Sequence, residues 1–381
     1  MRNYIPTYQE ALEIVKAKGN LIFYETIQYI DDYKISIFNY RLASYNDFIN
    51  PIDNKDINAK ELRGLTYIFN KDNSLYKKFL MFPKFWNINQ VSETQYNILK
   101  DLKIKYINTK EDGSLISFIG LPNGRIIPKT KAGLDNEQVL DVIDIYNKNE
   151  RLREFVKYCI DNDLSPLFEY VSFKNKIVLN YDKTDLILLK IRNNINGEFI
   201  DLSEVNTEGI TIVKTEPIIS LEELMNKIDN ATGIEGVVIT FDNDYMVKYK
   251  SLEYVALHRL IDYINREDYI ISSILNESID DVISKLNKNT NLERINYIKR
   301  INTIVIEYYS QRIKDVNNLV SQYNGSVKDF SIKYLKNENF HLALLVIKGE
   351  NVFNVVKNHI LKNTSQLKKA KNFIIDKKLA K

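Results

Sequence analysis

The chain has 381 residues, of which 44% are hydrophobic, so it is long enough for a complete core and for two domains. Its 53 basic and 50 acidic side chains leave a formal net charge of +3. A net charge this small excludes a protein that coats nucleic acid through its overall positive charge. Any anion binding must therefore come from local clusters of basic residues. The single cysteine, Cys159, excludes an internal disulfide framework and a cysteine-based zinc site.

The N-terminal stretch MRNYIPTYQEALEIVKAKGN lacks the continuous apolar core and cleavage site of a signal peptide. No later run reaches membrane-spanning length. We therefore expect a cytosolic protein that does not enter a membrane, in a host cytosol if it is viral.

Short runs of β-branched and aromatic residues with turn signals between them predict strands in the first part of the chain. They are YKISIFNY (33–40), GLTYIF (64–69), SLISFIGL (114–121), KIVLNY (176–181), DLILLKIR (185–192), GVVITF (236–241) and YMVKYK (245–250). A helical stretch is expected at 139–160. This pattern indicates an α+β fold with mostly antiparallel sheets.

The second part of the chain has a different composition. All seven prolines lie at or before Pro217, and ten of the twelve glycines lie at or before Gly236. From about Ser251, apolar residues recur at three- and four-residue steps, as in SLEYVALHRLIDYINREDYIISSILN. We expect an all-helical domain at 253–381 that packs directly after a first domain at 1–252.

Two basic segments come early in the first part. In ELRGLTYIF, Arg63 enters an apolar strand; its alternative interpretation is an edge arginine paired with Glu61 or with a distant carboxylate. In FPKFWNINQ, Lys84 is flanked by Phe85 and Trp86. The alternative there is an aromatic core cluster with a lysine that extends its amine to water.

The segment INTKEDGSLISF (107–118) sets Lys110 beside Asp112-Gly113, a pair suited to a tight turn. A turn does not explain the lysine. A nucleophilic amine would, but it must lose its proton to attack and needs cationic neighbours or a dry pocket to lower its pKa.

Two further segments carry charge inside predicted β-structure. In RIIPKTKAGL, Lys129 and Lys131 alternate to one face beside Gly133, and a basic loop is the alternative. In SPLFEYVSFKNKIVLNY, Glu169 lies between Phe168 and Tyr170 in a run that should be largely buried. Such a carboxylate is usually paired or functional, unless it sits on an edge strand and reaches water.

The segment IEGVVITFDNDYMVKYKS (234–251) predicts a hairpin that turns at residues 242–244. Because side chains alternate on a strand, Lys248 and Lys250 share a face. Like charges so placed repel unless they are solvated or face an anion. An exposed basic strand face is the alternative for these two lysines taken alone.

The common signatures are missing, since the chain has no Gly-Lys pair for a phosphate loop and no HExxH. The scattered cations and the few carboxylates together suit a triphosphate with a divalent metal. Lys248 and Lys250 would also disfavour the protonated form of Lys110.

Four segments resemble motifs I, III, IV and V of the covalent nucleotidyltransferases in order and spacing: KEDGS, FEYVS, IEGVV and KYKS. Within that superfamily the chain resembles the phage-type RNA ligase 1 group, because ELRG, KFWN and KTKAG are similar to that group's upstream and motif Ia elements. The resemblance spans essentially the whole chain. Trp86, Ala132 and Tyr249 differ from the commonest family residues, but none of these differences removes a reacting group.

The resemblance implies an ATP-dependent RNA ligase that joins 5′-phosphate and 3′-hydroxyl RNA ends. Lys110 would form lysyl-AMP with ATP, AMP would pass to the RNA 5′-phosphate, and a 3′-hydroxyl would displace it. Residues 1–252 would be the adenylyltransferase domain, and residues 253–381 would select RNA.

The resemblance also implies roles for individual residues. The catalytic set is Lys110, Asp112, Gly113, Glu235, Lys248 and Lys250. The ATP-binding set is Arg63, Lys84, Trp86, Lys131, Glu169, Gly236, Val238, Lys248 and Lys250. Glu169 and Glu235 would hold Mg²⁺ or Mn²⁺, mainly through water.

The helical domain would favour tRNA cleaved in the anticodon loop, and the family implies a monomer that acts beside an end-healing kinase and phosphatase. The tail LKNTSQLKKAKNFIIDKKLAK carries seven lysines against Asp376, and we favour a solvated terminal helix over a specific RNA contact. Asp280-Asp281 lies where a further metal-linked aspartate is expected, without a motif to anchor it. His258, His341 and His359 are too scattered for a metal site.

Two alternatives are weighed against an RNA ligase. A DNA ligase or mRNA capping enzyme shares the Lys-x-Asp-Gly chemistry but normally continues into an OB-fold domain of strands, which the helical second part disfavours. A non-catalytic RNA-binding repair protein has no need of a nucleophile, so the intact Lys110, Glu235 and Lys-x-Lys set disfavours that alternative.

Overall fold

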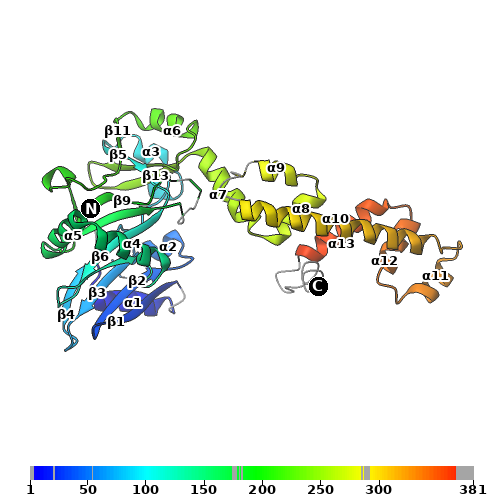
Figure 1. Cartoon of the computed structure of the whole chain (residues 1–381), viewed down its shortest axis with the longest axis horizontal. Coiled ribbons are helices and arrows are strands. Elements are labelled where there is room, and N and C mark those ends of the chain that lie inside the picture. Colours follow the sequence, from blue (N-terminus) through cyan, green and yellow to red (C-terminus); the bar gives the residue numbers. More distant parts are fainter. Residues whose placement is uncertain are drawn as a thin grey trace. The chain divides into compact units, whose positions relative to one another are not determined.

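The structure is a computed structural model that describes residues 4–19, 22–53, 55–173, 178–179, 181, 183–284, 286 and 292–365. The chain divides into two compact units, Met1–Val255 and Ala256–Lys381 (Figure 1). The division falls inside a helix, α7 (Leu252–Ile264), so the first turn of that helix belongs to the first unit.

In the described part of the first unit the strands form three sheets, and the strands within each pair antiparallel. The first has the order β1 (Phe23–Ile30), β2 (Tyr33–Tyr40), β3 (Leu65–Phe69), β4 (Leu75–Phe79). The second has the order β10 (Phe199–Ile200), β9 (Asp185–Asn193), β8 (Leu164–Val171), β6 (Ser114–Gly120), β7 (Ile126–Thr130). The third has the order β11 (Thr215–Glu216), β5 (Ile104–Lys110), β12 (Gly236–Phe241), β13 (Met246–Lys250). The predicted α+β fold with antiparallel sheets is confirmed.

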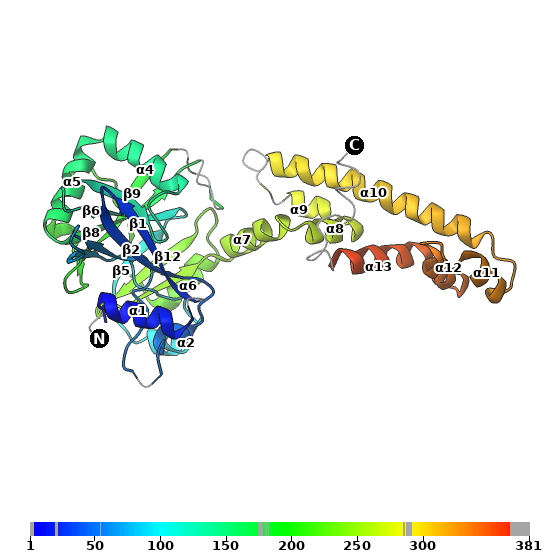
Figure 2. The same ribbon diagram turned by 90° about the horizontal axis from the view of Figure 1, so that it is seen from below.

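Helices accompany these sheets in the first unit. They are α1 (Tyr8–Ala17), α2 (Tyr45–Ile49), α3 (Tyr96–Leu99), α4 (Glu137–Lys148), α5 (Glu150–Asp161) and α6 (Leu221–Asp229), with the 3₁₀ turns Ser92–Thr94 and Leu202–Glu204. Helix α4 contacts β7, and α5 contacts β6 and β8, so both helices lie against the five-stranded sheet (Figure 2).

The single helical stretch expected at 139–160 is two helices. Asn149 adopts an extended conformation and ends α4. Its side chain then accepts a hydrogen bond from the amide of Leu152, at 3.0 Å, and so caps the start of α5. An asparagine that can cap a new helix therefore breaks a continuous periodic pattern.

The strand expected at 176–181 is wrong for the residues that the structure describes. Val178 and Leu179 lie in bends, and their amides donate to the carboxylate of Asp112 instead of to a neighbouring strand. The rest of that prediction, except for Tyr181, lies outside the described residues.

A buried ion pair connects the five-stranded sheet to the chain that leads into β3. Arg192 on β9 donates to both carboxylate oxygens of Glu61, at 2.6 and 2.8 Å, and also to the carbonyl of Met81. Both side chains are almost fully buried, so each charge compensates the other in a setting that water does not reach. Glu61 therefore pairs with Arg192 and not with Arg63, which excludes one of the two partners that the alternative interpretation of that segment allowed.

The second unit is all-helical in the residues described, as predicted. Its helices are the remainder of α7, then α8 (Glu267–Leu275), α9 (Ile279–Ser284), α10 (Leu292–Val320), α11 (Val327–Tyr334), α12 (Phe340–Ile347) and α13 (Val352–Ser365). Helix α10 contacts α8, α12 and α13 and buries Ile298, Val305 and Val316 in their shared core. No helix in the described ranges is long and apolar enough to cross a membrane. The lysine-rich tail beyond Ser365 lies outside the described residues.

Candidate active site

A cavity of about 510 Å³ opens in the first unit, lined by residues of both the five-stranded sheet and the sheet that contains β5. It collects seven of the residues predicted from the sequence: Arg63, Lys110, Gly113, Lys131, Glu169, Val238 and Lys248. The lining does not include Lys84, Trp86, Asp112, Glu235, Gly236 or Lys250.

Strand register brings two distant motifs together. On β12, Gly236 lies opposite Lys110 of β5 on one side and opposite Lys250 of β13 on the other. Val238, two residues along, lies opposite Asn108 and Lys248 in the same way. The predicted hairpin of β12 and β13 is confirmed. Because β12 also pairs with β5, the hairpin lies beside Lys110 at the end of β5.

Glu235 joins the two lysines that flank Gly236. Its carboxylate is 2.8 Å from Nζ of Lys110 through one oxygen and 2.8 Å from Nζ of Lys250 through the other. Glu235 is only 2% exposed, so these two cations compensate a buried charge. The sequence predicted that Lys110 would face cations; the structure places a carboxylate between Lys110 and Lys250.

Gly236 is required by the closeness of β13. A Cβ built on Gly236 would overlap the carbonyl oxygen of Tyr249, and its φ of +150° also disfavours a side chain. The absence of a side chain therefore lets β12 approach β13 beside Glu235.

Gly113 and Glu169 meet on the floor of the cavity. The amide of Gly113 donates to one carboxylate oxygen of Glu169 at 3.1 Å. A Cβ on Gly113 would overlap the carbonyl oxygen of Tyr170, so the turn after Lys110 presses directly on β8. Burial raises the pKa of Glu169 to about 7, with Lys110 opposing the rise and Glu235 adding to it.

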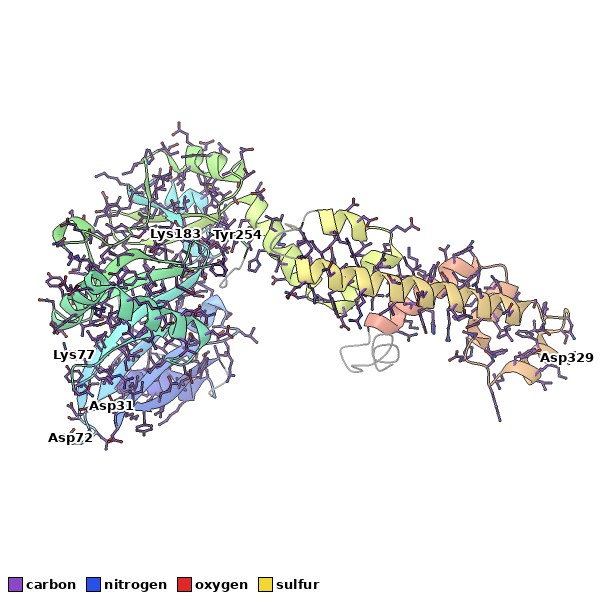
Figure 3. The ribbon with its side chains drawn as sticks, viewed as in Figure 1. Asp31, Asp72, Lys77, Lys183, Tyr254 and Asp329 are labelled. Carbon is purple, nitrogen blue, oxygen red and sulfur yellow. The ribbon has the colours of Figure 1, made fainter. Side chains whose placement is uncertain are left out.

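Asp112 is directed away from the cavity and is 1% exposed. One oxygen accepts the amides of Val178 and Leu179 at 2.8 and 2.7 Å, and the other accepts the hydroxyl of Tyr254 at 2.7 Å. Tyr254, labelled in Figure 3, lies at the start of α7. Asp112 therefore anchors the turn that carries Lys110, rather than facing a ligand.

Lys248 lies in the cavity wall, with Nζ 5.7 Å from the centre of the Phe85 ring. Burial, with a smaller effect of the cations Lys110, Arg63, Lys84 and Lys250, lowers the pKa of Lys248 to about 7. A cation held among other cations in a concave site is an attractive partner for a polyanion.

A second group of cations surrounds the hydroxyl of Tyr40. Burial raises the pKa of Tyr40, but Arg63, Lys84 and Lys131 outweigh it, so the net pKa is lowered. Lys84 lies 3.5 Å from the Tyr40 oxygen, and Arg63 donates to the carbonyl of Phe82 at 3.4 Å. These three cations come from separate segments and converge beside the cavity.

Trp86 lies elsewhere than predicted. It is 3% exposed and packs against Tyr45 and Phe48 in the core, while Phe85 lines the cavity. Lys84 lies over the Trp86 ring at 6.0 Å, which matches the aromatic-cluster alternative for this segment. In an extended segment neighbouring side chains point to opposite faces, so only one of the two aromatic residues could reach the cavity.

Lys129 is also in the core. It is fully buried, and its Nζ donates to the carbonyl of Gly64 at 2.9 Å. Lys129 thus supports the backbone beside Arg63, while Lys131, beyond the end of β7, lines the cavity.

Three contributors were missed by sequence reasoning: Tyr40, Phe85 and Tyr254. Tyr254 lay inside a periodic helical pattern, where an apolar position reads as core. Phe85 and Tyr40 carried no charge to single them out. Only the fold brings them to the site.

The two carboxylates predicted to hold a divalent cation, Glu169 and Glu235, both lie at this site, and Glu111 lines the cavity as well. Their charges act on each other, because Glu235 raises the pKa of Glu169, and a cation near both would relieve that repulsion. Oxygen donors suit Mg²⁺ and Mn²⁺. Within the described ranges no group of three or more His, Cys, Asp or Glu could hold a metal ion, so water and phosphate would have to complete any coordination. Asp280 and Asp281 are in α9 of the helical unit.

A lysine at the end of β5, held beside a carboxylate and surrounded by cations in a cavity, defines an enzyme site for phosphoryl or nucleotidyl transfer. Residues 61–254, just over half of the chain, match the model of a family described as RNA ligase, of the T4 RNA ligase 1 type. The chain belongs to this family and is an RNA ligase, whose substrate is RNA.

The similar proteins are ligases as well. A protein of Thermovibrio ammonificans named "Putative RNA ligase" is 25% identical over 378 residues, which cover 96% of this chain and 94% of the relative. The structure titled archaeal ATP-dependent RNA ligase, form 1, is 16% identical, covers 81% of this chain and 78% of its own, and has a TM-score of 0.46. The Naegleria gruberi RNA ligase with PPi is 12% identical, covers 62% and 98%, and has a TM-score of 0.35.

Proposed function

We propose that this RNA ligase uses ATP to join 5′-phosphate and 3′-hydroxyl RNA ends through a covalent lysyl-AMP on Lys110. The observation that carries the proposal is the placement of Lys110, which lines the cavity within 2.8 Å of Glu235, while Lys248 lines the same wall. A binding protein has no need of an amine in that position. The family favours RNA over the DNA ligase and capping alternatives.

In the first step, Nζ of Lys110 attacks the α-phosphorus of ATP. A nitrogen–phosphorus bond forms, the bond from that phosphorus to the bridging oxygen breaks, and pyrophosphate leaves. Glu235 lies within hydrogen-bond distance of Nζ and can take the proton that the amine must lose. The pair with Lys250 keeps Glu235 in place.

Cations on this chain stabilise the charge that moves in that step. Lys248 is our candidate for the α-phosphate, because it is the cavity lysine opposite Val238 and beside Lys110. Arg63, Lys84 and Lys131 are the candidates for the departing pyrophosphate. On β12, Val238 lines the cavity that would hold the nucleotide, and Gly236 lets this strand approach β13.

Glu169 and Glu235 would hold Mg²⁺ or Mn²⁺, largely through water, and the metal would supply positive charge to the phosphates. Asp112 and Gly113 hold the turn that positions Lys110. In the second step AMP moves from Lys110 to the RNA 5′-phosphate, and in the third the RNA 3′-hydroxyl attacks that phosphate and releases AMP.

Incubation with α-labelled ATP and magnesium tests the proposal. We expect an acid-labile, covalently labelled protein that is absent in Lys110→Ala. Folded protein freed of pyrophosphate that forms no adduct would contradict the lysyl-AMP route, and an adduct that persists in Lys110→Ala would place the nucleophile elsewhere.

We further propose that the helical unit favours tRNA cleaved in the anticodon loop, on the basis of the family resemblance. A paired stem with an open loop offers shape and phosphates to an RNA-binding domain. A chain ending at Asn265 keeps Tyr254 and α7. It should lose the preference for nicked tRNA over linear RNA while still forming the adduct; equal loss on both RNAs would argue against the proposal. A kinase and phosphatase partner and a monomeric state remain predictions.

A further inference from the structure

The cavity that contains Lys110 continues into a second, smaller one. This second cavity measures about 210 Å³ and shares four lining residues with the first: Asn108, Leu189, Lys190 and Val213. Lys190 is the one charged residue among these four. It stands at the junction of the two cavities.

The amine of Lys190 is held without a close acid. Its Nζ lies 4.3 Å from the centre of the Tyr106 ring. Burial lowers the pKa of Lys190, Lys105 adds to this effect, and Asp201 and Asp244 oppose it from farther away. Among the described residues Lys190 forms no ion pair: Asp201 accepts the hydroxyl of Tyr106, at 2.5 Å, and Asp244 pairs with Lys105. A partly buried ammonium in this state gains free energy from any ligand atom that accepts its hydrogen bond.

Strand geometry separates Lys190 from the phosphate end of the cavity. Tyr106, Asn108 and Lys110 share one face of β5, because side chains alternate along a strand. Lys190 lies over Tyr106, four residues before Lys110, which corresponds to about 13 Å along the strand. Lys110 lines only the larger cavity, whereas the amine of Lys190 lies over Tyr106, which lines only the smaller one, so the two lysines lie apart along the site.

The wall between these two lysines carries Asn108 and several apolar side chains. Val238 lies opposite Asn108 on β12, and Leu189 and Val213 line the cavity next to Lys190. A nucleotide whose α-phosphate lies at Lys110 would place its flat base along this wall, with the base edge toward Lys190. Arg63 and Lys131, the candidates for binding the phosphates of ATP, would not contact the base near Lys190.

We infer that Lys190 is a specificity-determining residue whose amine donates a hydrogen bond to a ring nitrogen of the purine base of ATP. The inference rests on the proposed function, because it takes Lys110 as the position of the α-phosphate. Adenine offers three ring nitrogens as acceptors outside the glycosidic bond, N1, N3 and N7. Through this hydrogen bond the site would recognise the base of the nucleotide as well as its phosphates.

The test combines three ATP analogues with two variants. The 1-deaza, 3-deaza and 7-deaza analogues each replace one ring nitrogen with a carbon that cannot accept a hydrogen bond. Lys190→Met keeps the length of the side chain and removes the donor. Lys105→Met is the matched control, because Lys105 lines only the smaller cavity.

Binding of each nucleotide is measured by calorimetry in Lys110→Arg protein, which cannot form the adduct, alone and combined with each variant. One analogue should bind Lys110→Arg at least about tenfold more weakly than ATP, as expected for a lost hydrogen bond to a charged group. That difference should vanish with Lys190→Met and persist with Lys105→Met.

The inference is overturned if all three analogues bind like ATP, or if the same analogue is still discriminated after Lys190→Met. Because binding is measured without turnover, the result is independent of adduct formation in the wild-type protein. Failure of the adduct together with discrimination through Lys190 would refute the lysyl-AMP route and leave the base contact in place.

Discussion

The hydroxyl of Tyr254 donates a hydrogen bond to Oδ1 of Asp112, 2.7 Å away and 142 residues earlier in the chain. The other oxygen of Asp112 accepts two backbone amides. The turn that follows Lys110 is therefore fixed by the first turn of α7 as well as by its own strand. Residues beyond the last strand of the sheet are part of the support of the nucleophile.

Tyr254→Phe should destabilise the protein by about 2 kcal/mol, because a buried carboxylate loses one of its three donors. Urea unfolding measures the change. Tyr158→Phe, at a side chain that is 48% exposed, is the control and should have little effect. A Tyr254→Phe protein as stable as the wild type would show that the hydroxyl is not an anchor.

Gly113→Ala should lower the free energy of unfolding by roughly 1–3 kcal/mol, since the new methyl group overlaps the carbonyl oxygen of Tyr170 on β8. The turn must shift to relieve the overlap, so adduct formation should fall too. Gly133→Ala is matched, because its Cβ meets no atom closer than 3.4 Å and its φ is not in the left-handed region. Similar losses in both variants would contradict the steric explanation.

These two residues show what sequence could and could not predict. The motif singled out Asp112 and Gly113 and predicted that they shape the turn that carries Lys110, and the fold supplies the contacts by which they do so. Their partners, Tyr254 and Tyr170, lie in other elements and carry no local signal. Tertiary contacts, rather than the motif, define these roles.

The placement of the lysines near Lys110 was also predicted only in part. Alternation predicted that Lys248 and Lys250 share a face, and both lie on β13 of the predicted hairpin, because period-two geometry is local. It could not predict that Glu235 lies between Lys110 and Lys250, which depends on the pairing of β5 with β12. Nor could it decide between Phe85 and Trp86, because that depends on which face of the segment meets the core.

Glu169→Gln should change how stability depends on pH. Burial raises the pKa of Glu169 to about 7 from an ordinary 4.5, so the folded chain holds this proton more tightly than the unfolded chain. The wild type should lose up to about 3 kcal/mol of stability from this group as the pH rises from about 4.5 to about 7, and the variant should not.

Urea unfolding at pH 4.5, 7 and 8 checks this expectation. The pKa of Lys248 is lowered from its ordinary 10.5 to about 7 in the folded chain. This lysine therefore changes the free energy of unfolding mainly above pH 7, whereas Glu169 changes it mainly below pH 7. Glu208→Gln, at an exposed side chain, is the control. A pH profile of Glu169→Gln that parallels the wild type below pH 7 would refute the assignment.

Lys131→Met should impair the first reaction step more than the third. Lys131 lies in the cation group with Arg63 and Lys84, the candidates for the pyrophosphate of ATP. In pre-adenylylated RNA the AMP is already joined to the RNA 5′-phosphate and the pyrophosphate of ATP has left, so joining this RNA does not need cations that hold the departing pyrophosphate. We expect adduct formation at low ATP concentration to fall by tenfold or more, roughly the loss of one charge-assisted hydrogen bond, and joining of pre-adenylylated RNA to change less than about twofold.

Lys100→Met, at an exposed lysine outside the cavity, should alter neither step. If both steps fell together in Lys131→Met, this lysine would instead hold a group common to both, such as the AMP phosphate or the RNA strand.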